Sequence, residues 1–110
     1  MGRGYKIIAV DFDGTLCTDK YPEIGSPARG LINLLKSRKE AGDKLILWTC
    51  RVGERLQEAV GWCSQSGLEF DAVNENLPEM IEYFGQDTRK IHADVYIDDK
   101  AVNETSADFV

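Results

Sequence analysis

Short apolar runs rich in β-branched residues alternate with segments of helical apolar spacing, and this alternation limits the fold more than any other feature. The first run, Ile7-Ile8-Ala9-Val10, is continuously apolar, which is typical of a strand buried on both faces. Strands that alternate with helices form parallel sheets through right-handed crossover connections. The sequence therefore predicts an α/β fold with a doubly wound (Rossmann-like), mainly parallel sheet flanked by helices.

Three later apolar runs are also predicted to be strands. They are Leu45 to Trp48 within the segment 44–49, Phe70 to Val73, and Val95 to Ile97. The segment from Leu16 to Gly25 contains several turn residues, so it predicts a loop, with a small hairpin as the alternative.

Three segments are predicted to be helices. Ser26-Pro27 is typical of an N-cap followed by proline at the first helical position, and Gly42 is a suitable stop for this helix. Apolar residues within 56–63 follow i, i+3, i+4, i+7 spacing, so the second helix is expected to run to about Gly67. Pro78 to Phe84 predicts a short third helix.

Length, charge and cysteine content exclude several classes of protein. The 110 residues match one domain, so 1–110 is expected to be a single catalytic domain without a sizeable lid. The net charge of −6 argues against general nucleic-acid binding, which uses basic patches. Three cysteines without a C-x-x-C pair indicate neither a disulfide framework nor a zinc site, and reduced thiols fit the cytoplasm. No apolar stretch approaches the roughly 20 residues that a membrane span needs.

Oxygen-bearing side chains follow three of the predicted strands. Asp11 and Asp13 follow the first strand, Thr49 ends the second, and Asp98 and Asp99 end the last. The carboxyl ends of strands in an open parallel sheet lie along one edge, where ligands bind. Gathered carboxylates repel one another without a cation, and Mg²⁺ takes one or two protein carboxylates together with substrate phosphate. The residues therefore predict a Mg²⁺ site that receives a phosphate group.

These groups, together with Lys90, resemble the four motifs of the haloacid dehalogenase-like (HAD) phosphatase superfamily in their order. The first motif is Asp11-Phe12-Asp13-Gly14-Thr15 after a hydrophobic strand, and the second is Thr49. The third is Lys90 upstream of the last strand, and the fourth is Asp98-Asp99. The resemblance extends from about residue 6 to residue 100 and implies a HAD-like core. The sequence around these motifs also looks like that of small, uncharacterised bacterial HAD-like hydrolases. This resemblance does not indicate a substrate.

The resemblance implies a Mg²⁺-dependent phosphomonoester hydrolase and gives its acids separate roles. Asp11 would be the nucleophile that forms an aspartyl-phosphate. Asp13 would be the general acid for the leaving alcohol and then the base that activates water. The Mg²⁺ ion would be held by the carboxylates of Asp11 and Asp98 and by the backbone carbonyl of Asp13, while Asp99 acts through water or orients the site.

Thr49 and Lys90 would hold the oxygens of the transferring phosphoryl group. Lys90 precedes Asp98 by only eight positions, and Lys100, beside the acidic pair, is the alternative.

Other polar residues near these motifs are candidates with a second reading. Arg51 and Asn74 are candidates for substrate binding. For Arg51 the alternative is an ion pair with Glu54 or Asp13, and for Asn74 it is a plain polar loop. Asn76 is read in the same way as Asn74, and Cys50 is interpreted as a small residue beside the site.

The kind of substrate to expect follows from the absence of a lid in the sequence. In this superfamily a lid is inserted after the first motif or between the second and third, and here both connections are short, so the chain resembles a capless member. Capless relatives often act on macromolecular ends or use a neighbouring subunit as the lid. The phosphorylated partner is thus a small molecule or a macromolecular end. Nucleic acid is disfavoured by the charge, no membrane partner is indicated, and a homo-oligomer stays open.

Two functions of other classes are alternatives. A receiver-like, phospho-accepting signalling module also combines acids, a Thr and a Lys on a doubly wound sheet. In receivers the acidic pair follows the first strand and the acceptor Asp ends the third, whereas here the pair comes last. A non-catalytic binding domain would not require every one of these groups.

Overall fold

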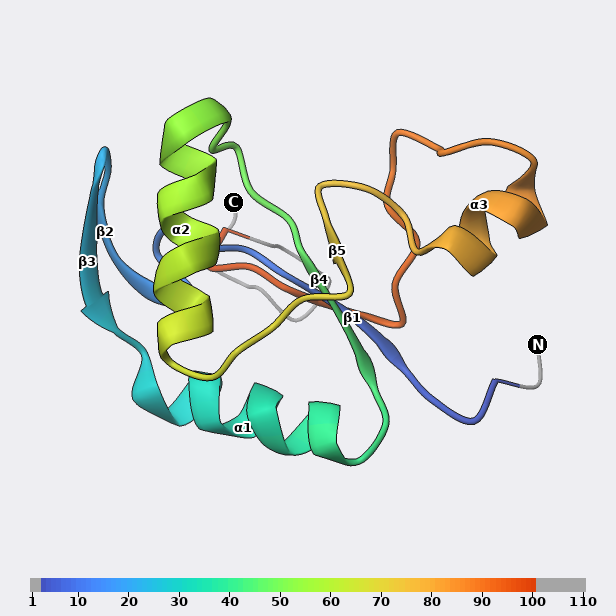
Figure 1. Ribbon diagram of the computed structural model, residues 1–110, viewed down its shortest axis with the longest axis horizontal. Coiled ribbons are helices and arrows are strands. Elements are labelled where there is room, and N and C mark those ends of the chain that lie inside the picture. The colour runs from blue at the N-terminus through green and yellow to red at the C-terminus, as the bar shows by residue number, and fades with distance from the viewer. Residues whose placement is uncertain (1–2, 101–110) are drawn as a thin grey trace, which may run out of the picture.

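The computed structural model describes residues 3–100, and its centre is a four-stranded parallel sheet with the order β5-β4-β1-β6 (Figure 1). The strands are β1 (Ile7–Val10), β4 (Lys44–Leu47), β5 (Ala72–Val73) and β6 (Val95–Ile97). The central strand β1 pairs with β4 on one side, where Ile7 lies opposite Lys44, and with β6 on the other, where Ile8 lies opposite Val95. All three strand pairs are parallel, as the sequence predicted.

Three helices flank this sheet. They are α1 (Arg29–Glu40), α2 (Gly53–Gln65) and α3 (Pro78–Phe84). Side chains alternate between the two faces of a strand, so Ile8 and Val10 pack with residues of α1 and α2, while Ile7 and Ala9 pack with Met80 of α3. Both faces of β1 are therefore buried. The chain has an α/β fold, compatible with a Rossmann-like arrangement.

A two-stranded hairpin replaces the loop expected after the first strand, so the alternative interpretation is the correct one. Strand β2 (Cys17–Lys20) pairs antiparallel with β3 (Glu23–Pro27). The strands approach closely because Gly25 has no side chain, and a Cβ at this position would collide with Thr18. The amide of Ser26 donates to Thr18 Oγ1 at 2.9 Å. In Figure 1 the hairpin lies beside α2.

The prediction that Ser26-Pro27 opens the first helix is wrong. Both residues belong to β3, where Pro27 lies opposite Cys17, and the helix begins at Arg29 with Ala28 as its N-cap. The amide of Ala28 donates to the carbonyl of Leu16 at 2.9 Å. The hairpin pairing thus occupies the residues that would otherwise have capped the helix.

At the amino-terminal edge of the sheet, aspartates accept backbone amides. Each bond is 2.8 or 2.9 Å long: Asp43 accepts from Lys6, Asp71 from Leu45, and Asp94 from Ile7. The amide donor lowers the pKa of Asp43 below its usual value, with Arg38 adding to the effect. These acids are therefore partners of the strands rather than members of a cluster of like charges.

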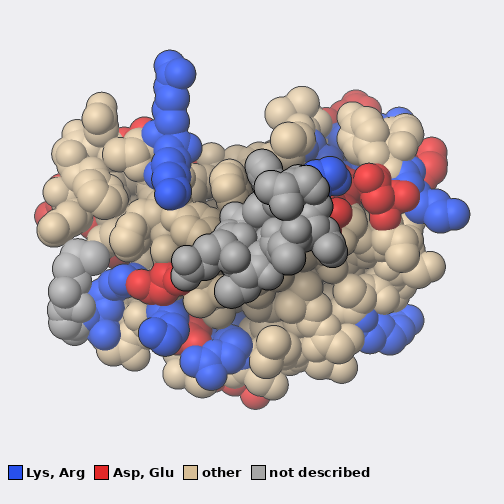
Figure 2. Space-filling model, turned by 180° about the vertical axis from the view of Figure 1, so that it is seen from behind, with Lys and Arg blue, Asp and Glu red and all other residues tan. Residues whose placement is uncertain are grey.

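On the face seen in Figure 2, Lys and Arg side chains lie interspersed with Asp and Glu rather than gathered in one basic area. Within residues 3–100, α2 is the longest helix at 13 residues, and none has the length and hydrophobicity to cross a bilayer.

Candidate functional site

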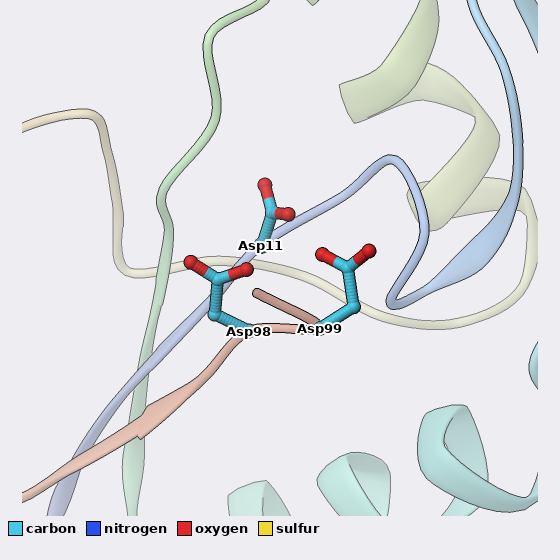
Figure 3. Close-up of side chains that lie close together, drawn as sticks. All are labelled: Asp11, Asp98 and Asp99. Carbon is cyan, nitrogen blue, oxygen red and sulfur yellow. The ribbon is translucent and has the colours of Figure 1, made fainter. Parts of the chain in front are cut away.

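Three acids from the two ends of the sequence meet at the carboxyl edge of the sheet. Asp11 follows β1, and Asp98 and Asp99 follow the neighbouring strand β6. Each offers a carboxylate oxygen, and these oxygens all lie within 4.8 Å of one another (Figure 3). The amide of Asp11 donates to the carbonyl of Ile97 at 2.9 Å, so the strand pairing extends to the site itself. The predicted convergence of these acids is confirmed.

Gly14 and Thr15 of the first motif allow Asp99 to pack closely against the loop after β1. Gly14 has a φ of +83°, and a Cβ there would lie 2.5 Å from an oxygen of Asp99. The amide of Asp99 donates to Thr15 Oγ1 at 3.1 Å. Gly14 is thus required both by its backbone conformation and by the approach of Asp99.

When no cation is bound, the environment of Asp11 disfavours its charged form more than water does. Burial, the largest cause, raises the pKa of Asp11 from 3.8 to about 6, although a hydrogen bond from the Phe12 amide lowers it. The charges of Asp98, Asp99 and Asp13 raise it further. Hard oxygen donors that repel one another in a partly buried place are the donor set that Mg²⁺ prefers. The residues present therefore fit a divalent cation.

Thr49 lies beyond the end of β4, and its own hydrogen bonds orient it. Its amide donates to Asn74 Oδ1 at 2.8 Å, and its Oγ1 accepts the amide of Arg51 at 3.1 Å. Because the hydroxyl accepts this amide, its own proton stays available for a ligand oxygen. Asn74, at a positive φ of 55°, accepts the amide of Thr49 and does not line the pocket, so its role in the structure is to support Thr49.

Arg51 forms an ion pair with Asp13, one of the alternatives raised from the sequence. The residue is 1% exposed, and its Nε and Nη2 donate to the two carboxylate oxygens of Asp13 at 2.9 and 2.8 Å. The remaining N–H groups donate to the carbonyls of Pro22, Glu23 and Arg55. All five guanidinium donors thus have protein acceptors, so this arrangement leaves none for a substrate oxygen.

The two candidate lysines lie in different places. The ammonium of Lys90 lies 5.7 Å from the centre of the Tyr96 ring, and Lys90 does not line the pocket. Lys100 does line the pocket, and its Nζ lies 3.5 Å from Asp99 Oδ2. The structure thus brings Lys100, the alternative, to the acids rather than Lys90.

A pocket of about 530 Å³ opens at this edge. Its lining consists of Asp11, Asp13, Asp19, Tyr21, Trp48, Thr49, Cys50, Arg51, Asp98 and Lys100. Asp19, Tyr21 and Trp48 were not singled out from the sequence. Trp48 directly precedes the Thr motif, which is a signal that could have indicated it, whereas Asp19 and Tyr21 arrive only through the hairpin.

The last two candidates differ in their relation to the pocket. Asn76 is buried and bonds to Asp87, Thr88 and the amide of His92, which makes it a support of the loop after β5. Cys50 is exposed, lines the pocket, and carries a free thiol. The interpretation of Cys50 as a small residue beside the site agrees with this placement.

Comparison with known proteins finds a similar solved structure. Neither a protein-family model nor a curated protein matches the chain. A solved structure, of a conserved protein from Bacteroides thetaiotaomicron, is 44% identical over 90% of this chain and 79% of that chain, with a TM-score of 0.80. The chain belongs to the same family as this conserved protein.

Proposed function

We propose that the chain is a Mg²⁺-dependent phosphomonoester hydrolase with a HAD-like core, acting in the cytoplasm through an aspartyl-phosphate on Asp11. The observation that carries the proposal is the meeting of Asp11, Asp98 and Asp99, whose oxygens lie within 4.8 Å of one another. The order of the motifs along the chain supports it, because each conventional role in such a hydrolase has a residue at this edge, with Lys100 in place of Lys90.

The proposed Mg²⁺ ion would be held by the carboxylates of Asp11 and Asp98 and by the backbone carbonyl of Asp13. The carboxylate of Asp13 pairs with Arg51 and is not one of the three that gather, which supports ligation through its carbonyl. Asp99 forms an ion pair with Lys100, and its backbone amide donates to Thr15, so in this proposal it orients the site. When bound, the cation would neutralise these acids and polarise a phosphoryl oxygen.

In the proposed first step, a carboxylate oxygen of Asp11 attacks phosphorus and the bond to the leaving oxygen breaks, while that oxygen takes the proton that Asp13 carries at the start of the step. In the second step water attacks phosphorus, Asp13 takes the water proton, and Asp11 leaves as a free carboxylate with release of inorganic phosphate. Arg51 donates one hydrogen bond to each Asp13 oxygen. Each oxygen therefore keeps a second lone pair that can bind the proton transferred in these steps.

The first test is release of 4-nitrophenol from 4-nitrophenyl phosphate at increasing Mg²⁺ concentrations, with chelator as the blank. Hydrolysis is expected with Mg²⁺ and not with chelator. Asp98→Asn is expected to raise the Mg²⁺ concentration for half-maximal activity about tenfold or more, because it removes a charged ligand.

The matched control for this test is Asp71→Asn, at the opposite edge of the sheet. Asp71 accepts the amide of Leu45, a role that an Asn oxygen also fills, so wild-type hydrolysis is expected. Equal Mg²⁺ dependence of the Asp98→Asn variant and the wild type would contradict the metal site. Phosphorylation of Asp11 that persists without turnover would favour the receiver-like alternative instead.

A second test separates the two lysines. Lys100→Ala is expected to lower kcat/KM for 4-nitrophenyl phosphate by about tenfold or more, because the ammonium beside Asp99 would neutralise phosphoryl oxygens. Lys90→Ala removes the same charge at a place outside the pocket lining, and its kcat/KM is expected to stay within about twofold of wild type. The reverse ranking would return the phosphate-binding role to Lys90.

A further inference from the structure

The pocket at the carboxylates is larger than its inorganic occupants require. A water molecule occupies about 30 Å³ in the liquid, so a hydrated cation with a phosphoryl group fills only part of the 530 Å³. Pockets of a few hundred cubic ångströms bind small organic ligands, and apolar or aromatic side chains normally line them. Beyond the charged groups, this pocket is lined by the aromatic residues Tyr21 and Trp48.

Tyr21 reaches the pocket from the turn of the β2–β3 hairpin. It is 59% exposed, yet its ring lies 5.1 Å from the guanidinium carbon of Arg51. That guanidinium is itself fixed by Asp13, by the carbonyls of Pro22 and Glu23, and by the Phe12 ring, whose centre lies 5.0 Å away. An exposed ring held in this way is preorganised, so a ligand that contacts it pays little ordering entropy.

Trp48 lines the same pocket from the end of β4, directly before Thr49. Its amide donates to the carbonyl of Val10 at 2.9 Å, which fixes its backbone to β1. Its ring packs against Tyr96 with the centres 5.6 Å apart and the planes at 59°. Trp48 therefore also has a supported position, on a different element from Tyr21.

We propose that this pocket selects small phosphomonoesters whose organic part carries an aromatic or other planar ring, which contacts Tyr21 and Trp48. The phosphate end of this inference rests on the proposed function, while the ring end rests on the pocket lining alone. A small molecule is favoured over a macromolecular end because the pocket already provides volume and apolar contact for a ring. The hairpin thus supplies part of the wall that a separate lid would otherwise provide.

Binding of two non-hydrolysable phosphonates in the presence of Mg²⁺ tests the inference without requiring turnover. Phenylphosphonate carries the ring and methylphosphonate lacks it. The chain has two tryptophans, Trp48 in the pocket and Trp62 packed edge-on against Phe12, so binding of phenylphosphonate is followed by quenching of Trp48 fluorescence. Binding of methylphosphonate is measured by its competition with phenylphosphonate. Trp48→Phe is expected to remove the ligand-dependent signal and to leave the emission of Trp62.

Phenylphosphonate is expected to bind about tenfold more tightly than methylphosphonate. Tyr21→Ala is expected to reduce this ratio to about twofold and to leave the affinity for methylphosphonate nearly unchanged, whereas Tyr21→Phe retains the ratio because it keeps the ring. The ratio separates contact with the ligand from a general loss of stability, which would weaken both phosphonates equally.

Equal affinities of the wild type for the two phosphonates, or no binding of either, would overturn the inference even if 4-nitrophenyl phosphate is hydrolysed. A retained preference in Tyr21→Ala would overturn the role of Tyr21. A phosphotyrosine peptide that binds about tenfold more tightly than phenylphosphonate would overturn the assignment to a small molecule. Preferential binding of phenylphosphonate without hydrolysis of any phosphoester would support the ring site and refute the proposed function.

Discussion

Replacing Asp11 by Asn is expected to abolish phosphoester hydrolysis and, without a divalent cation, to stabilise the protein above pH 6. Activity should fall about a thousandfold or more, because an amide cannot accept the phosphoryl group. The gain in stability arises from the same carboxylate, which burial and the neighbouring acids disfavour in its charged form. Opposite changes in activity and stability are typical of a residue retained for its chemistry.

The sign of the stability change follows from the pKa of Asp11, which is about 6 in the folded protein against a usual 3.8. Between these values the folded state binds a proton that the unfolded state has lost, so stability falls as the pH rises through this window. The full shift corresponds to about 3 kcal/mol, and partial solvation of the side chain reduces the expected effect to roughly 2 kcal/mol. Asn does not ionise, so Asp11→Asn avoids this loss at pH 7 to 8.

Urea denaturation of the wild type and Asp11→Asn with chelator, at pH 4 and pH 8, measures the difference directly. The two proteins should be nearly equally stable at pH 4, and the variant should be more stable at pH 8. Asp43→Asn is the control of opposite sign, because the pKa of Asp43 is lowered and its charged form stabilises the fold. That variant should be less stable than wild type at pH 7, with the difference shrinking in acid. A variant Asp11→Asn that is less stable at pH 8 would contradict this account.

The sequence was sufficient to predict the convergence of the acids because strand direction and burial are local signals. The apolar residues of β1 and β6 are each followed at once by acids, and parallel pairing of neighbouring strands brings those acids together. The helix α3 was predicted with its observed bounds, Pro78–Phe84, because proline marks its start and Gly85 directly follows its end.

The remaining parts of the site depend on contacts between residues distant in sequence. Arg51 and Asp13 are separated by 38 positions. Nothing in the sequence near either residue indicates that both oxygens of Asp13 bond to Arg51. Whether Lys90 or Lys100 lies at the site depends on where their side chains point. The eight positions between Lys90 and Asp98 do not determine this. Tyr21 enters the pocket only because the hairpin pairs Cys17 with Pro27, the same pairing that displaced the predicted N-cap.

Replacing Arg51 by Ala is expected to lower the free energy of unfolding by about 3 kcal/mol, near the lower end for breaking a buried ion pair because Asp13 is partly solvated. The substitution removes the partner of Asp13 and the donors to the carbonyls of Pro22 and Glu23 at the hairpin turn. Amide hydrogen exchange in the hairpin should therefore accelerate more than exchange in β1 and β4. Urea denaturation and exchange measurements on the same samples test both effects.

Arg55→Ala is the matched control, because Arg55 forms an exposed ion pair with Glu58 three positions further along α2. Its loss should change stability by no more than about 0.5 kcal/mol. If Arg51→Ala were as mild as this control, the buried pair would not hold the hairpin.

A large effect of Arg51→Ala also bears on variants of Asp13, because Asp13→Asn leaves the buried guanidinium of Arg51 without its carboxylate. A loss of turnover in Asp13→Asn therefore identifies an acid–base role only where the protein remains folded and the hairpin amides exchange as in the wild type.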